Sequence, residues 1–215
     1  RKRWPVKQSH INICMLLLVV LCAGLTVKQN TYWRSEVALF ERVLKYEKKL
    51  GRARILLARA YLNQKKYEKA AEQLLEALVI MKEYHKKVVS PEVQKIYGNF
   101  IKEIYVDLGR CYDGKEMWPE AIVQYKESLR LGEEGAVYNA IGMDCIQMNN
   151  PDAALENFEK AISLNSQNPH IMNNLAICYI QKGEKKAAID LLREVVRVDA
   201  SFLPAKQNLK KLLSQ

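Results

Sequence analysis

The sequence has few residues that interrupt helices and lacks the motifs of common enzymes. Only 9 glycines and 6 prolines occur among 215 residues, whereas 49% of the residues are hydrophobic. This composition favours an all-helical protein with a substantial core. The sequence contains no glycine-rich phosphate loop, no His-Glu-x-x-His motif and no Gly-x-Ser-x-Gly motif. These sequence signatures of nucleotide-binding enzymes, metalloproteases and serine hydrolases are therefore absent. We therefore expect a non-catalytic chain that needs no cofactor.

Paired cysteines and clustered histidines are also missing. The five cysteines include no Cys-x-x-Cys pair, and the three histidines are scattered along the chain. A buried cysteine acts as a small hydrophobic side chain, so we expect thiols in the core in preference to disulfides or metal ligands. The cysteines are Cys14, Cys22, Cys111, Cys145 and Cys178. No metal site is predicted.

A strong charge imbalance is absent from most of the chain. The net charge is +10, of which residues 1–50 carry +7 and residues 51–215 only +3. The excess lies on both sides of an uncharged segment, where basic residues suit lipid headgroups. Nucleic-acid binding is not expected, because a nearly balanced protein lacks the required basic surface.

The uncharged segment covers residues 11–27, "INICMLLLVVLCAGLTV". As a helix its 17 residues would reach about 25 Å, which is enough for a short membrane span. We predict a transmembrane helix here, after a basic flank at residues 1–10. A secretory signal peptide and a buried core helix are the alternatives, although no Ala-x-Ala cleavage site and no polar face is present. Four basic residues before the span and two after it favour an extracytoplasmic position for the rest.

A repeat of 34 residues follows. Residues 135–168 align with residues 169–202, which places Gly142 opposite Ala176 and Ala154 opposite Ala188. Residues 51–84 and 102–134 carry related residues in the same slots. We interpret each unit as two antiparallel helices. Small residues let the two helices approach, and large apolar residues fill the space between successive hairpins, which are stable only when stacked.

This pattern resembles the tetratricopeptide repeat (TPR), with its small residue at position 8, aromatic at 11 and alanines at 20 and 27. The resemblance implies an all-α fold, in which the N-terminal transmembrane helix is followed by a right-handed α-solenoid of helical hairpins. Residues 28–50 would form half a repeat, and residues 203–215 a capping helix. Residues 85–101 are an insertion that we expect to lengthen a helical hairpin, with Ser90 capping a helix that begins at Pro91.

TPR arrays present a concave groove lined by their first helices, and the resemblance places polar side chains in that groove. Asparagine can pair with a peptide backbone through one donor and one acceptor. A clamp for a terminal carboxylate is not expected, because the asparagine at position 6 in the last repeat has no basic neighbours. Ordinary solvated groove residues are the alternative interpretation. The candidate partner-binding residues are Arg59, Asn63, Arg110, Asn139, Met143, Asn173, Asn174 and Ile177.

The junction before the repeats carries a second resemblance. Asn30, Trp33 and Arg34, followed by Leu39 and Phe40, resemble the C-terminal region of transmembrane-and-TPR glycosyltransferase-like membrane proteins, which are related to protein O-mannosyltransferases. In that family the catalytic acidic residues lie upstream, so none is carried over to this chain. The leading hypothesis is a membrane-tethered TPR scaffold for protein–protein interaction. The alternatives are an accessory domain of a polytopic glycosyltransferase-like protein, and an assembly factor or small subunit of a membrane complex.

Overall fold

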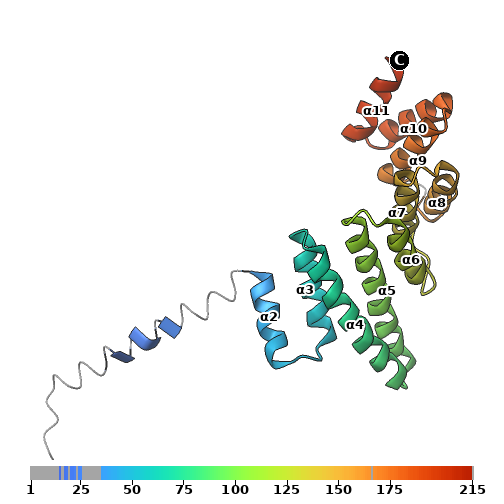
Figure 1. Cartoon of the computed structure of the whole chain (residues 1–215). Helices are drawn as coiled ribbons and strands as arrows, with labels where there is room; N and C mark the ends of the chain where they lie inside the picture. The colour runs from blue at the N-terminus through green and yellow to red at the C-terminus, as the bar shows by residue number, and fades with distance from the viewer. Residues whose placement is uncertain are drawn as a thin grey trace, which may run out of the picture.

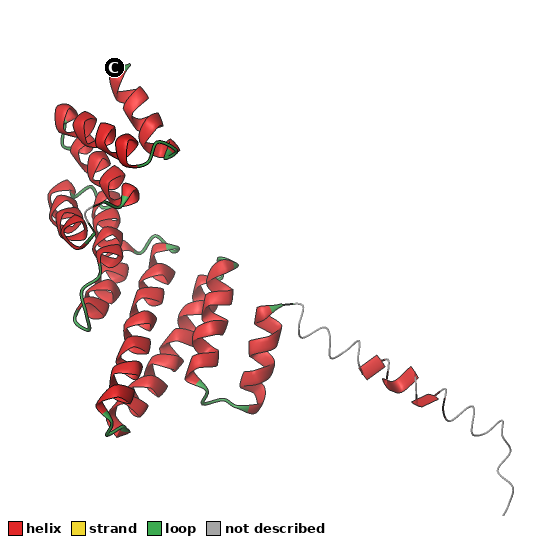
Figure 2. Ribbon diagram, turned by 180° about the vertical axis from the view of Figure 1, so that it is seen from behind, coloured by secondary structure: helices red, strands yellow, loops and turns green. Residues whose placement is uncertain are grey.

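The computed structural model describes residues 15, 17–18, 20–22, 24–25, 35–165 and 167–214. Between residues 35 and 214 the described chain forms helices and no strands (Figure 2). In order these are α2 (Glu36–Tyr46), α3 (Gly51–Asn63), α4 (Tyr67–Lys87), α5 (Pro91–Asp113), α6 (Trp118–Leu129), α7 (Gly135–Gln147), α8 (Pro151–Leu164), α9 (Pro169–Gln181), α10 (Lys185–Val198) and α11 (Leu203–Leu213).

The helices form a stack of antiparallel hairpins. The pairs α3/α4, α5/α6, α7/α8 and α9/α10 follow one another along the array, with α2 packed on α3 at one end and α11 on α10 at the other (Figure 1). Each helix packs mainly on its neighbours in sequence, as expected for a solenoid. The predicted all-helical solenoid of hairpins is thus confirmed.

The close approach within each hairpin depends on a matched pair of side chains. Gly109 lies against Tyr125 and Gly142 against Phe158, and a Cβ atom on either glycine would lie within 2.6 Å of the facing ring. In the other two hairpins the small residue is alanine, Ala58 or Ala176. There the aligned large residue is a fully buried leucine, Leu74 or Leu192. Glycine is therefore paired with an aromatic ring and alanine with the smaller leucine. This pairing keeps the packed volume similar from hairpin to hairpin.

One backbone conformation recurs in the turn inside every hairpin. Lys65, Glu116, Asn149 and Gly183 have φ values of 57°, 58°, 55° and 78°, which is the left-handed region. In each case the next amide donates to a carbonyl five residues back, for example Lys66 N to Tyr61 O at 2.9 Å. This arrangement is the Schellman motif, which ends a helix most easily with glycine.

Replacing Lys65 by glycine should therefore stabilise the fold. A non-glycine residue in this conformation costs about 1 kcal/mol, and Lys65 is exposed, so no packing is lost. We expect the free energy of unfolding to rise by about 0.5–1 kcal/mol in urea denaturation. Asn149→Gly is the control, with a smaller gain, because asparagine tolerates the left-handed region. An unchanged or lower stability for Lys65→Gly would contradict this reading of the turn.

Residues 85–101 occupy the end of α4, a short turn and the first turns of α5. These two helices have 21 and 23 residues, against 11 to 14 for the others, and Tyr84 stacks on Tyr97 with ring centroids 5.7 Å apart. Pro91 opens α5 as expected. Ser90 is the N-cap residue of α5, as predicted, but its side chain makes no capping hydrogen bond, and its hydroxyl donates to the Glu92 carboxylate at 2.6 Å.

The predicted membrane helix has to be corrected. The basic flank, most of residues 11–27 and residues 28–34 lie outside the described residues. In the part of the chain that the structure describes, no helix combines the length and the apolar character needed to cross a bilayer. This finding contradicts the predicted single-span membrane localisation and, with it, the extracytoplasmic position that depended on the span. Asn30, Trp33 and Arg34 of the second resemblance also lie outside the described residues.

Candidate partner-binding face

The first helices of the hairpins, α3, α5, α7 and α9, supply the candidate residues. We call the surface formed by these residues the first-helix face. Asn63 and Arg110 are exposed, whereas Asn173 is buried, with 6% of its surface accessible. The half-buried members are Arg59, Asn139, Met143, Asn174 and Ile177. Most of the polar members bond to a neighbouring helix, which the sequence did not reveal.

At the α3–α5 joint, charged side chains surround one buried carboxylate. Arg59 Nε donates to Asp107 Oδ2 at 2.6 Å, and its Nη2 donates to Glu103 Oε2 at 3.0 Å. Arg110 Nη1 donates to the other oxygen of Asp107 at 3.2 Å. Asp107 is only 3% exposed, so the two guanidinium groups compensate a charge that would otherwise be costly to bury. Arg59 thus holds two helices together and is less available to a partner than predicted.

Carboxamide pairs connect the later first helices. Asn174 Nδ2 donates to Asn139 Oδ1 at 3.0 Å, which joins α9 to α7. One repeat further on, Asn208 Nδ2 donates to Asn173 Oδ1 at 3.0 Å, which joins α11 to α9. Both pairs connect residues 35 apart. Asn139 and Asn174 are only half-buried, and Asn139 Nδ2 and Asn174 Oδ1 have no partner among the described residues. One open donor and one open acceptor therefore remain at the α7–α9 joint.

The α5–α7 joint carries two carboxyl groups, which sequence reasoning missed as a pair. Tyr125 donates its hydroxyl proton to Asp113 Oδ2 at 2.5 Å, and Asp113 is close enough to Asp144 for its charge to act on that carboxyl group. Asp144 is 3% exposed, and one oxygen of each aspartate is buried without a protein donor. Burial and the neighbouring Asp113 charge raise the pKa of Asp144 to about 8. Burial also raises the pKa of Asp113. One proton shared by the two groups satisfies this geometry at neutral pH.

The three cysteines of the repeats are buried, as the sequence predicts, whereas Cys22 is exposed. Cys111, Cys145 and Cys178 are buried and form no disulfide, and burial raises the pKa of the Cys111 thiol to about 12. Such thiols are inert at neutral pH. Within the described ranges, no cluster of three or more His, Cys, Asp or Glu side chains could hold a metal ion.

The stacked hairpins and the joined first helices define a helical repeat protein of the solenoid class. The family model of the tetratricopeptide repeat matches residues 37–83 and 146–213, which is more than half of the chain. The protein belongs to the tetratricopeptide repeat family. Members of this family act as protein-interaction scaffolds, and the chain has the corresponding architecture.

Individual relatives are more distant. The chain is 24% identical over 212 residues to the mouse protein O-mannosyl-transferase TMTC3, covering 80% of this chain and 22% of the relative. The chain spans about a fifth of the length of the curated relatives that it matches. This similarity does not establish the predicted link to glycosyltransferase-like proteins.

Two solved structures share the fold. The first is YrrB, described as a TPR protein with an unusual peptide-binding site, at 20% identity with a TM-score of 0.60. The match covers 81% of this chain and 82% of YrrB. The second is MamA, at 18% identity with a TM-score of 0.62, covering 76% of this chain and 86% of MamA. At these identities the similarity establishes the fold alone.

Proposed function

We propose that this TPR array binds an extended segment of a partner protein across α7 and α9 on the first-helix face. The observation that carries the proposal is the Asn139–Asn174 pair, with its open donor and open acceptor. An extended peptide offers both groups along its backbone and can pair with both carboxamides at once. Among the described residues of this face, no other pair of bonded side chains is half-buried and keeps both an open donor and an open acceptor.

Apolar side chains beside this pair support the proposal. Met143 and Ile177 are half-buried on the same two helices, and Ile180 is 36% exposed. A peptide held by its backbone would place alternate side chains against such surfaces, which would give affinity and selectivity. Asn173 would contribute indirectly, because it is buried and bonded to Asn208. Asn63 and Arg110 are exposed and could extend the contact toward α3 and α5. The peptide-binding site that the description of YrrB mentions is consistent with this use of the fold.

Asn174→Ala should weaken peptide binding about tenfold. A phage-displayed peptide library selected on the whole chain would supply the ligand, and calorimetry would measure its affinity. The loss reflects a backbone hydrogen bond made at a half-buried site. Asn99→Ala is the matched control, since Asn99 is exposed on α5, and we expect its affinity to stay unchanged. The thermal midpoint of each variant checks the fold. Equal affinity for wild type and Asn174→Ala would reject the proposed site.

A second candidate function is that of an interaction module within a longer O-mannosyl-transferase-like protein. The match to TMTC3 over 80% of this chain favours it. An antibody raised against residues 35–214 would measure the size of the endogenous product. A product several times longer than 215 residues would support this candidate, whereas a product of about this length would reject it.

A further inference from the structure

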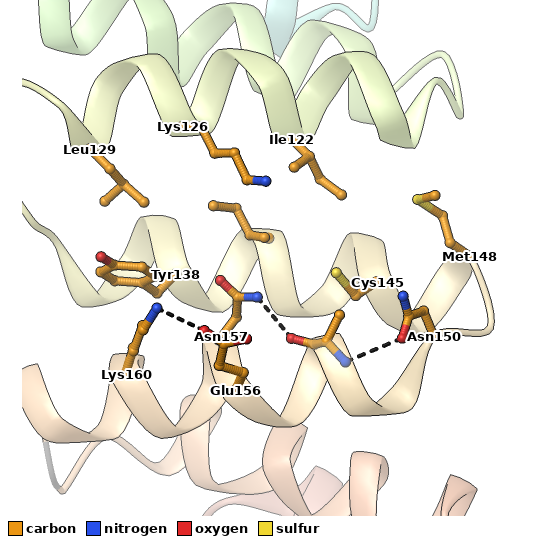
Figure 3. A pocket seen from close by; sticks show the side chains of 12 residues that line it. Ile122, Lys126, Leu129, Tyr138, Cys145, Met148, Asn150, Glu156, Asn157 and Lys160 are labelled. Carbon is orange, nitrogen blue, oxygen red and sulfur yellow. Dashed lines mark hydrogen bonds and ion pairs between the residues drawn. The ribbon is translucent and has the colours of Figure 1, made fainter.

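A pocket of about 500 Å³ lies between α6, α7 and α8, and no candidate residue of the first-helix face lines it. Its apolar walls include Ile122 and Leu129 from α6 and Cys145 from α7. Figure 3 shows Ile122 and Lys126 pointing from α6 toward α7. The pocket is large enough for an aromatic side chain with neighbouring atoms.

The pocket exists because one repeat lacks its aromatic residue. Position 11 is tyrosine in three of the four repeats, as Tyr61, Tyr112 and Tyr179, but it is Cys145 in the third. Tyr61 shows what the ring does elsewhere. It is 6% exposed, and its hydroxyl donates to Glu41 Oε1 of the preceding helix, α2, at 2.6 Å. The short thiol of Cys145 cannot cross to α6 in this way, so the corresponding space stays open.

The charge at this joint is inverted as well. Glu41 follows Phe40 in α2, and Glu159 follows Phe158 in α8. The charge of Glu159 adds to burial in raising the pKa of Tyr179, so tyrosine and glutamate are neighbours at that joint too. The aligned residue in α6 is Lys126, which follows Tyr125. Where two joints combine a phenol with a carboxylate, this one combines an open space with an ammonium group.

The Lys126 ammonium group is available to a ligand. Lys126 is exposed and has no hydrogen-bond or ion-pair partner among the described residues. The second lysine of the pocket, Lys160, is already bound to Glu156 at 2.9 Å and lies over the Tyr138 ring. The rim therefore has one uncompensated positive charge beside an apolar hollow. Its complement is a bulky ring with a carboxylate close by.

We propose that the α6–α8 pocket binds an aromatic side chain of a partner peptide, with an adjacent carboxylate of the same peptide on Lys126. The ring takes the place that tyrosine fills in the other repeats. The carboxylate supplies the negatively charged partner that the Lys126 ammonium group lacks. This site is separate from the first-helix face and does not depend on the function proposed for that face.

Nuclear magnetic resonance titration of the full chain tests the site. The probe is acetyl-Glu-Phe-Glu-amide, and the controls are acetyl-Glu-Ala-Glu-amide and acetyl-Lys-Phe-Lys-amide. We expect saturable shifts at the amides of Tyr138, Ile141 and Cys145 with the probe. Each control peptide should bind at least about tenfold more weakly, since it lacks the ring or the charge. Absence of saturable shifts at these amides, or equal binding of the lysine peptide, would overturn the proposal.

Two substitutions separate the contributions of space and charge. Cys145→Tyr should reduce probe affinity at least about tenfold, because the new ring occupies the pocket. Lys126→Glu should reduce it several-fold without disturbing the fold, since Lys126 is exposed. The double variant recreates the Tyr61–Glu41 arrangement and should have a higher thermal midpoint than Cys145→Tyr alone. Asn174→Ala should leave probe binding unchanged, which distinguishes this site from the first-helix face. Wild-type affinity in both Cys145→Tyr and Lys126→Glu would contradict the assignment.

Discussion

Asp144→Asn will make the protein more stable at pH 8.5 than the wild type, by about 2–4 kcal/mol in free energy of unfolding. In the folded chain burial and Asp113 raise the pKa of Asp144 to about 8, whereas an unfolded aspartate titrates near 3.9. The folded state therefore binds an extra proton between about pH 4 and pH 8. Stability falls as the pH rises through this window, because folding then has to retain a proton or bury a second charge.

The asparagine removes this titration and keeps the shape of the joint. Its amide can donate to the Asp113 carboxylate, which also accepts from Tyr125 at 2.5 Å and lies near the charge of Arg110. At pH 4 the two proteins should differ little, because Asp144 is then protonated in the folded wild type and about half protonated in its unfolded state. Urea denaturation at half-unit intervals of pH measures the difference.

Asp190→Asn is the matched control for this series. Asp190 is exposed on α10, and its nearest cation, Arg193, lies 3.7 Å away. Its substitution should leave the slope of stability against pH unchanged. Parallel profiles for wild type and Asp144→Asn would show that the two carboxyl groups do not share a proton in the folded joint.

Gly142→Leu will lower the free energy of unfolding by about 3 kcal/mol, at the upper end of overpacking costs. Even a Cβ atom at this position would lie 2.6 Å from the Phe158 ring. Phe158 is completely buried, so its ring has no room to move aside. Thermal and urea denaturation of the full chain measure the loss. An unchanged thermal midpoint would reject the proposed alignment of the repeats.

A double-mutant cycle tests the physical reason for this loss. The fourth hairpin combines Ala176 with Leu192, both fully buried. Gly142→Ala together with Phe158→Leu would reproduce that combination in the third hairpin. We expect the pair to be at least about 1 kcal/mol more stable than the two single effects add up to. Additive effects would mean that the glycine and the ring do not share one packing space.

The sequence predicts the hairpins well because their determinants are local and repeated. The small residue at position 8 and the large residue at position 24 belong to two helices joined by a short turn. Their spacing is therefore fixed within one unit, as for Gly142 and Phe158. The long α4 and α5 follow from the inserted residues by the same reasoning. Stacking then follows, since each hairpin leaves an apolar face that only a neighbour can cover.

The polar joints could not be predicted in the same way. Asn139 contacts Asn174, and Asp113 lies near Asp144. Which residues of successive hairpins come together depends on how each hairpin is rotated relative to the preceding one. A periodic pattern identifies which residues belong to first helices but not which of them meet. The sequence therefore found Arg59 and Asn173 as candidates and missed that both hold neighbouring helices together.

The membrane prediction was wrong for a different reason. It depended on the apolar character, length and basic flanks of residues 11–27, which do not by themselves distinguish a membrane span from other apolar segments. The capping hydrogen bond expected from the Ser90 side chain is also absent. A cap requires the serine oxygen to accept from a backbone N–H, whereas the Ser90 hydroxyl is oriented to donate to Glu92 two residues later.

Site-specific photo-crosslinking tests the central claim that partners bind the first-helix face. p-Benzoylphenylalanine would replace Met143, half-buried on α7, or Val123, which is 54% exposed on α6. The peptide selected on the whole chain would be added to each protein, irradiated and quantified by mass spectrometry. The account predicts strong crosslinking from position 143, with tryptic fragments of the peptide attached there, and little from position 123. Equal crosslinking from both positions, or crosslinking only from position 123, would contradict it.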